Sequence, residues 1–270
     1  MEEIVMTSLA VWPGIDSRGL STIYIASDSR LSWSGSADSW DRGVKVFVCP
    51  LTPDIFGFYG DVLVPSMVLP RIVEGPILAL LPDSLRRHAS VYQMVRSCAD
   101  ALPGARRGTF GIFHASRDGK GQASNRLLWH TQWNPKKGWS DTLIPLEGVS
   151  ALTVSAGSGE FVVSNHTSAA RTELGAVSRS VFTGFCDGLI SGDDPRSGGP
   201  PQLVGLYRQG YGMHFGVIFQ GKSYYRGVDA MSLAVPNLEW RNELFERCDS
   251  SGQRLIGAQA QPRLGKPKDS

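Results

Sequence analysis

The sequence predicts an α+β fold in which antiparallel sheets carry helices on their outer side. Two observations lead to this prediction: strand-like segments come in blocks, and helical segments come in separate blocks between them. The strict strand–helix alternation of a doubly wound sheet is absent from the sequence. We expect one domain over 7–248, after a short extension over 1–6 and before a polar, disordered tail over 249–270.

The first 60 residues are predicted to be strands. TSLAVW and TIYIASDS are rich in apolar and β-branched residues, and the Gly-containing connection PGIDSRGLS suits a hairpin. After the polar stretch RLSWSGSADSWDRG come VKVFVCP and IFGFYG, which are separated by a Pro-Asp turn signal.

Helical spacing begins after Gly60. The segment VLVPSMVLPRIVEGPILALLP contains internal prolines, which remove helix hydrogen bonds, so we expect a kinked or split helix. A second helix is predicted over SVYQMVRSCADAL with Ser90 as its N-cap, and a third helical stretch over about 168–189.

Strands are predicted again in both remaining blocks. They are GTFGIFHAS, LLWHTQW, TLIPL and ALTVSAG before the third helix, and QLVGLYRQ, HFGVIFQ and SYYRGV after it. PNLEWRNELFERC is predicted to be a short helix that opens at Asn237. The segment 117–141, with three of the seven tryptophans, has no clear place in this scheme.

Composition excludes several classes of function. A net charge of +2 with scattered Lys and Arg gives no basic patch for nucleic acid or an anionic membrane. The N-terminus lacks a signal sequence and no apolar run is long enough to span a membrane, so we expect a cytoplasmic protein. The five histidines lack metal-ligand spacing, and the four cysteines lie far apart without a CxxC pair, so free thiols are expected and no metal site.

Thr7, Asp28 and Lys45 are the first candidates for chemistry. Alone, an Asp in SDSR is an ordinary turn former and a strand-edge Lys is ordinarily solvated. Once residues 1–6 are removed, however, Thr7 carries an α-amine whose pKa of about 7.7–8.0 suits proton transfer, and a Thr hydroxyl beside its own amine is a recognised nucleophile. If the strand ends meet, Lys45 lowers the pKa of that amine and Asp28 holds Lys45 in an ion pair.

The order of these segments resembles the proteasome β-subunit family, which includes the bacterial HslV-type and Anbu-type peptidases. A Thr opens the first strand, and IYIASDSR, KVF and FGFYGD follow, with SAGSGEF and DPRSGG later in the chain. The resemblance covers about residues 7–230. It implies the N-terminal-nucleophile (Ntn) hydrolase fold, a four-layer αββα sandwich with two antiparallel sheets between helical layers.

The same resemblance implies roles for further residues. Gly60 would supply the backbone N–H of an oxyanion hole, and Arg30 would support the Asp28 turn. Ser158, Asp194 and Ser197 would form a hydrogen-bonded group around the amine of Thr7. The implied activity is that of a threonine-type peptidase that needs no cofactor and acts on a peptide or protein. The implied assembly is a homo-oligomeric ring or stack with an ATP-dependent unfoldase as partner. Phe58, which lies near the site in sequence, is a candidate for the wall of a substrate pocket.

One departure from the family pattern leaves an alternative open. Self-cleaving members have Gly before the Thr, whereas this chain has Met6, and Glu2 would block removal of an initiating Met1. If residues 1–6 stay attached, Thr7 has no free amine. The alternative function is then a catalytically silent structural or regulatory subunit of the same type.

A different nucleophile is also conceivable from the sequence. GFCDG fits the G-x-nucleophile-x-G pattern around Cys186, with His214 as base and Asp194 or Asp229 as its partner. That pattern requires a strand before the cysteine and a helix after it. The ordinary alternative is a buried Cys on a helix packed through small residues, which the sequence favours.

Overall fold

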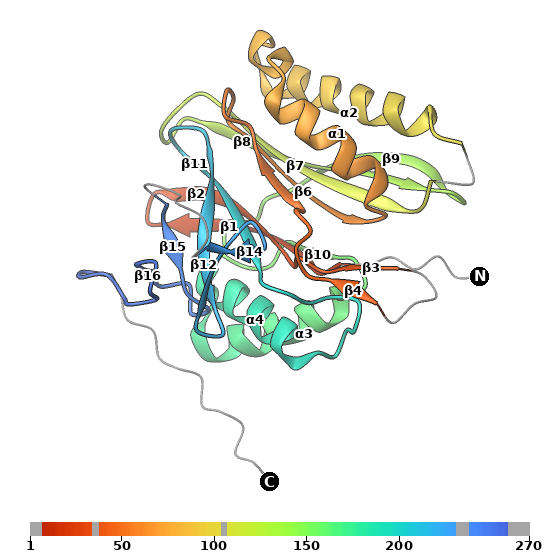
Figure 1. Cartoon of the computed structure of the whole chain (residues 1–270). Helices are drawn as coiled ribbons and strands as arrows, with labels where there is room; N and C mark the ends of the chain where they lie inside the picture. The colour runs from red at the N-terminus through yellow and green to blue at the C-terminus, as the bar shows by residue number, and fades with distance from the viewer. Residues whose placement is uncertain (1–6, 34–37, 104–106, 231–237, 259–270) are drawn as a thin grey trace.

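The structure is a computed structural model that describes residues 7–33, 38–103, 107–230 and 238–258. Its strands pair into three sheets (Figure 1). The largest contains nine strands: β1 (Leu9–Asp16), β2 (Gly19–Ser27), β10 (Val154–Ala156), β11 (Gln202–Tyr207), β12 (Gly212–Phe219), β13 (Lys222–Tyr225), β14 (Val228–Asp229), β15 (Trp240–Arg241) and β16 (Arg247–Cys248). The second contains five: β5 (Val46–Val48), β6 (Asp54–Gly60), β7 (Phe110–Asp118), β8 (Asn125–Asn134) and β9 (Gly138–Ile144). The third pairs β3 (Leu31–Ser32) with β4 (Ser39–Trp40).

Four α-helices and one 3₁₀-helix accompany these strands within the described residues: α1 (Leu63–Glu74), η1 (Ile77–Leu80), α2 (Ser84–Asp100), α3 (Glu160–Leu174) and α4 (Ser178–Ser191). α1 and α2 lie on the side of the five-stranded sheet, and α3 and α4 lie on the side of the nine-stranded sheet (Figure 1).

The expected fold class is wrong as stated. The described chain is mostly antiparallel sheet divided among three sheets, and β15 joins β12 in a parallel pair, so the molecule is not a clear four-layer αββα sandwich of two antiparallel sheets. The physical reason is that alternation along the chain identifies strands but not their partners. The polar stretch after β2 and the segment after 237 both contribute short strands that this alternation does not reveal.

The prediction of a split first helix is confirmed. α1 has Pro65 in its first turn, where a missing N–H costs nothing, and Pro70 inside it. The helix ends at Glu74 with Gly75 as its C-cap, and the separate 3₁₀ turn begins at Ile77 directly after Pro76.

Other predicted helix boundaries are corrected. α2 begins six residues earlier than Ser90, because the side chain of Asp83 caps it by accepting from the N–H of Arg86 at 2.8 Å. The third helical stretch is two helices separated near Gly175, whose φ of +80° ends α3. The short helix expected in PNLEWRNELFERC is replaced by β15 and β16, while Asn237 lies outside the described residues.

The tryptophan-rich segment 117–141 belongs to the five-stranded sheet. It completes β7, forms β8 and begins β9, and Trp133 faces Trp139 across the β8–β9 ladder. The first residues of the expected tail also have structure, because Asp249 donates its N–H to the carbonyl of Gln253 at 2.9 Å and Leu255 donates to Arg247 at 3.0 Å.

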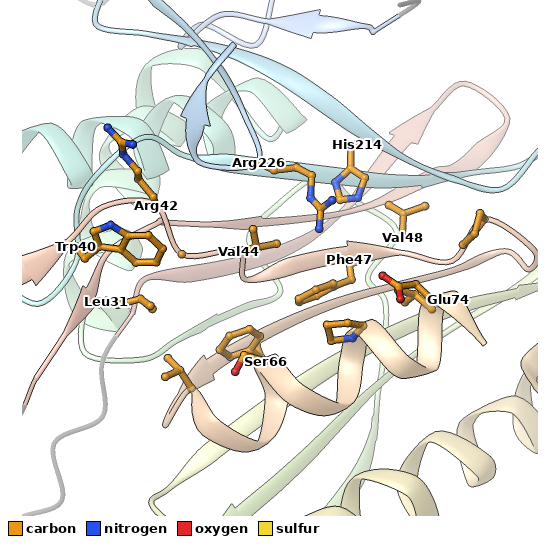
Figure 2. A pocket seen from close by; sticks show the side chains of 16 residues that line it. Leu31, Trp40, Arg42, Val44, Phe47, Val48, Ser66, Glu74, His214 and Arg226 are labelled. Atoms are coloured by element: carbon orange, nitrogen blue, oxygen red, sulfur yellow. The ribbon is translucent and has the colours of Figure 1, made fainter. Parts of the chain in front are cut away.

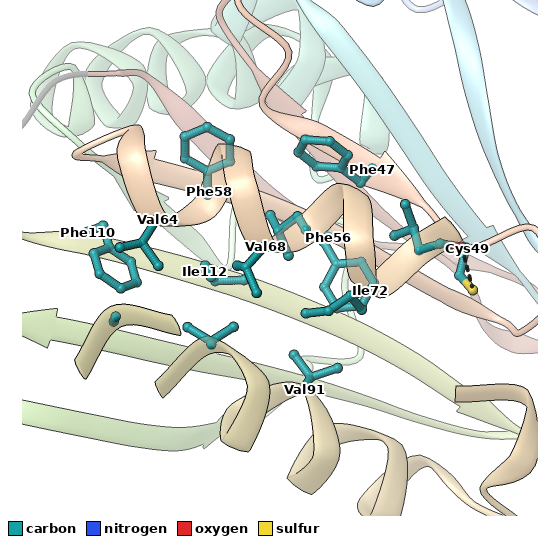
Figure 3. Packing of buried hydrophobic residues seen from close by; sticks show 14 of the residues in the cluster. Phe47, Cys49, Phe56, Phe58, Val64, Val68, Ile72, Val91, Phe110 and Ile112 are labelled. Atoms are coloured by element: carbon teal, nitrogen blue, oxygen red, sulfur yellow. Dashed lines mark hydrogen bonds between the residues drawn. The ribbon is translucent and has the colours of Figure 1, made fainter. Parts of the chain in front are cut away.

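Apolar side chains hold the sheets and helices together. Figure 3 shows Val64, Val68 and Ile72 of α1 packed near Phe56 and Ile112 of the five-stranded sheet. A second cluster joins the two large sheets, and a third joins α4 to the nine-stranded sheet. This packing fixes the ends of β1, β2 and β5 near one another, which is where the candidate catalytic residues lie. No helix in the described part of the chain combines the length and apolarity needed to cross a membrane.

Candidate active site

Pairing of β1 with β2 brings Thr7 and Asp28 to the same end of the nine-stranded sheet. Leu9 lies opposite Ser27 in this antiparallel pair, so the residues just beyond it face each other as well. The N–H of Ser8 donates to Asp28 Oδ1 at 3.2 Å, and the N–H of Asp28 donates to the Ser8 carbonyl at 3.0 Å. The start of β1 is therefore tied directly to the turn that carries Asp28.

Lys45 lies at the centre of the site. Its Nζ donates to Thr7 Oγ1 at 2.8 Å, to Asp28 Oδ1 at 2.7 Å and to the Arg30 carbonyl at 2.5 Å. These three bonds use all three donors of an ammonium group. Thr7, Asp28 and Lys45 are all completely buried. The structure thus brings together the first three predicted residues.

Burial dominates the electrostatics of this pair. It raises the pKa of Asp28 and lowers the pKa of Lys45, and the attraction between the two opposes both shifts. Three backbone N–H groups also favour the ionised carboxylate: Ser8 bonds Oδ1, while Arg30 and Gly198 bond Oδ2 at 3.2 and 3.0 Å. An ammonium held against the Thr7 hydroxyl stabilises the alkoxide form of that oxygen.

Ser158, Asp194 and Ser197 form a second predicted group. Both serine hydroxyls donate to Asp194 Oδ2 at 2.6 Å. The hydroxyl of Ser8 donates to Ser197 Oγ at 2.8 Å, so the group reaches the residue next to Thr7. The N–H of Gly159 adds a bond to the Thr7 carbonyl at 3.3 Å.

Arg30 supports the loop that carries this second group. Its guanidinium makes a two-point ion pair with Asp41, at 2.7 and 2.9 Å, and its Nη1 donates to the carbonyl of Pro195 at 3.2 Å. A side chain at Gly198 would lie 2.5 Å from the guanidinium carbon, so glycine is required for this close approach. Arg30 therefore connects the Asp28 turn to the 194–198 loop.

Gly60 ends β6 with φ +86°, a left-handed value that suits glycine. A Cβ there would lie 2.4 Å from the carbonyl oxygen of Thr109, so the chain has no room for a side chain. The contacts of Gly60 are thus with β7. Its role as an oxyanion donor stays a prediction.

Thr7 has an unusual backbone. Its φ is +100°, which is costly for a β-branched residue, on the order of 1–3 kcal/mol. The φ torsion exists only while residue 6 is attached, so a chain that began at Thr7 would not carry this strain. With the full chain present Thr7 is inaccessible to solvent.

Three residues that contribute to the site were not identified from the sequence. Ser8 and Asp41 make the bonds given above, and Gln202 holds two loops together. Its amide donates to the carbonyls of Asp28 and Gly43 at 3.1 and 2.7 Å, and its oxygen accepts from the N–H of Lys45 at 3.2 Å. The one signal that the sequence offers is that Gln202 is a polar residue at the start of a predicted strand, directly after Pro-Pro.

A cavity of about 650 Å³ adjoins the site (Figure 2). Leu31, which follows Arg30, and Gly43 and Val44, which precede Lys45, contribute to its wall. Phe47 and the predicted wall residue Phe58 also line it, and most of the lining is apolar. The segments that position Lys45 therefore also form one side of this cavity.

The alternative nucleophile lacks the geometry that it requires. Cys186 lies inside α4 rather than on a strand-to-helix turn, and it packs in a buried apolar cluster. Burial raises the pKa of its thiol well above the ordinary value, which disfavours the reactive thiolate. In the described residues no group of three or more His, Cys, Asp or Glu side chains is arranged to hold a metal ion.

Comparison with known proteins adds no family assignment. No protein-family model matches the sequence, and no curated protein matches it significantly. The functional argument therefore depends on the geometry of the site.

Proposed function

We propose that the chain is a threonine-type N-terminal-nucleophile hydrolase that cleaves amide bonds, in particular peptide bonds, once residues 1–6 have been removed. The observation that carries the proposal is the 2.8 Å contact between Lys45 Nζ and Thr7 Oγ1, with the Asp28 carboxylate on the other side of the ammonium. The proposal agrees with the resemblance to proteasome β-type peptidases.

The reaction proceeds by covalent catalysis. Thr7 Oγ1 attacks the carbonyl carbon while its proton passes to the free α-amine of the same residue. The tetrahedral oxyanion is stabilised by a backbone N–H, for which Gly60 is the candidate. The amine then protonates the leaving nitrogen, the amide bond breaks, and an ester to Thr7 remains. Water hydrolyses the ester and restores the hydroxyl.

The other residues position these groups. Lys45 lowers the energy of the Thr7 alkoxide, and Asp28 holds Lys45 in place. The group of Ser158, Asp194 and Ser197 lies beside residue 8 and would orient the freed amine. The adjoining cavity would receive a substrate side chain.

The test compares hydrolysis of fluorogenic peptide amides by wild-type protein and three variants. Thr7→Ala should abolish turnover, while Thr7→Ser, which keeps a hydroxyl, should retain part of it. Thr172→Ala is the matched control, since Thr172 is exposed on α3 and only bonds the Ser168 carbonyl. Turnover that survives in Thr7→Ala would rule out the proposed nucleophile.

The silent-subunit alternative has one observation in its favour, because Thr7 is buried in the full chain. Intact-mass and N-terminal analysis of the purified protein separates the two functions. A chain that begins at Thr7 supports the hydrolase. A chain that keeps residues 1–6 and has no peptidase activity supports the silent subunit.

A further inference from the structure

One end of the cavity beside the site carries polar groups without partners. His214 of β12 and Arg226, which follows β13, lie side by side there (Figure 2). Within the described residues, neither the buried Nδ1 of His214 nor the buried Nε of Arg226 has a hydrogen-bond partner. Buried polar groups are ordinarily satisfied, so two unpartnered nitrogens on side chains that line one cavity, one of them the N–H donor Nε of Arg226, indicate a ligand with a polar acceptor group.

The charges around the cavity indicate whether that acceptor group is neutral or negatively charged. The ionisable lining residues are Arg42, Glu74, His214 and Arg226. Arg42 and Glu74 are exposed, so solvent screens them, whereas Arg226 is half-buried and no described carboxylate forms an ion pair with it. Burial and the charge of Arg226 lower the pKa of His214 to about 3, so its ring is neutral at pH 7. This end of the cavity therefore holds one uncompensated positive charge beside a neutral imidazole.

We propose that this cavity binds a carboxylate side chain, so that the enzyme prefers to cleave peptides carrying Glu or Asp at the residue it accommodates. The inference deepens the proposed function and rests on it. The carboxylate would accept from Arg226 and from the imidazole of His214, forming charge-assisted bonds in mostly apolar surroundings. The methylenes of the same side chain would lie along Phe47 and Val44.

Other side chains fit this cavity less well. A Lys or Arg would place a second cation beside Arg226 without a buried anion. An apolar side chain would suit Phe47 and Phe58 but would leave both buried nitrogens without a partner, whereas a carboxylate would supply an acceptor. We therefore expect kcat/KM to be higher for Glu than for its neutral isostere Gln, and higher for Gln than for Lys.

The first test measures kcat/KM for acetyl-Ala-Ala-Xaa aminocoumarin amides with Glu, Gln, Leu or Lys as Xaa. Wild-type protein should prefer Glu to Gln by about tenfold or more, as expected for a charge-assisted bond. Arg226→Gln should bring that ratio close to one, and Arg226→Lys should restore part of it. Arg71→Gln, an exposed arginine of α1 outside the cavity, should leave the ratio as in wild type. A wild-type preference for Gln or Leu, or an unchanged ratio in Arg226→Gln, would overturn the proposal.

A binding measurement separates this inference from the proposed hydrolysis. Calorimetry with acetyl-Ala-Ala-Glu-amide and its Gln counterpart needs no turnover, and the terminal amide leaves the side chain as the only carboxylate. If wild-type protein cleaves nothing but binds the Glu peptide more tightly, and Arg226→Gln loses that difference, then the cavity is confirmed and the hydrolase is not. Equal binding of the two peptides, or no binding of either, would contradict the inference about the cavity.

Discussion

Lys45 is the single residue on which the candidate site most depends. A fully buried ammonium is costly unless every donor has a partner, and here the partners come from two segments: Thr7 before β1, and the turn after β2, which supplies the Asp28 carboxylate and the Arg30 carbonyl. Removing the Asp28 carboxylate leaves the ammonium charge uncompensated, and removing the Thr7 hydroxyl leaves one of its donors without a partner. The contacts that stabilise the buried Lys45 are therefore the same contacts that place its ammonium against the Thr7 hydroxyl.

A double-mutant cycle measures that coupling. Lys45→Met and Asp28→Asn should each lower the free energy of unfolding by about 3–5 kcal/mol, because each leaves the other group buried and unpaired. The double variant should lose less than the sum, by about 1–3 kcal/mol. Urea unfolding at neutral pH provides the three values. Strict additivity would show that the two side chains do not interact as the structure indicates.

At the scale of elements, the start of α3 shows how tightly one element can be placed against the site. Gly159 precedes α3, and a Cβ at this position would lie 1.8 Å from Ser8 Oγ. The glycine has an ordinary φ of −85°, so the constraint is steric and not conformational. A Cβ at Gly159 would also lie 3.0 Å from Ser197 Oγ, so the missing side chain leaves room for the hydrogen bond between Ser8 and Ser197.

Gly159→Ala should displace Ser8 and destabilise the protein by about 1–3 kcal/mol, as overpacking usually does. Gly148→Ala is the matched control, because a Cβ there meets nothing within 4 Å. The control should be neutral or slightly stabilising, by up to about 1 kcal/mol. Thermal and urea unfolding of both variants provide the measurement, and equal effects at the two glycines would contradict the close packing at 159.

Local sequence signals predicted where strands and helices lie better than they predicted which strands pair with one another. Alternation located β1, β2, β6 and β7, and the prolines located the break after α1, because these signals act within a few residues. β15 was missed because the parallel pairing of Trp240 with Gly216 joins distant segments. No local pattern distinguishes such a two-residue strand from a short helix.

The same limit applies to the candidate site. Thr7, Asp28 and Lys45 could be predicted because each lies near the end of a recognisable strand and because the order of these segments resembles that of the proteasome β-subunit family. Asp41 and Gln202 could not, since Asp41 lies in a polar stretch and Gln202 acts through backbone carbonyls of loops that are distant in sequence. Their contribution appears only once the sheets are assembled.

At the scale of the whole molecule, buried titratable groups connect the five-stranded sheet to α2. His114 Nε2 contacts Asp54 Oδ1 at 2.8 Å, His114 Nδ1 contacts His88 Nδ1 at 3.0 Å, and Arg87 Nε lies 2.9 Å from Asp54 Oδ2. The ion pairs and hydrogen bonds lower the pKa of Asp54 to about 2 although its burial acts to raise it. Asp54 therefore contributes stability that is present above its unfolded pKa of 3.8 and is lost as the pH falls toward 2.

His130 of β8 makes stability depend on pH in a higher window. Its ring contacts the Tyr59 hydroxyl at 3.0 Å and stacks on Phe113, and burial lowers its pKa from 6.5 to about 4. Between these two pH values the unfolded chain binds a proton that the folded chain does not, so stability decreases as the pH falls from 6.5 toward 4. This shift corresponds to a loss of about 3 kcal/mol. In His130→Gln, urea unfolding at pH 7.5, 6, 5 and 4 should show a smaller loss than in wild type, because Gln does not titrate. A loss as large as that of wild type would mean that other groups, and not His130, set the pH dependence in this window.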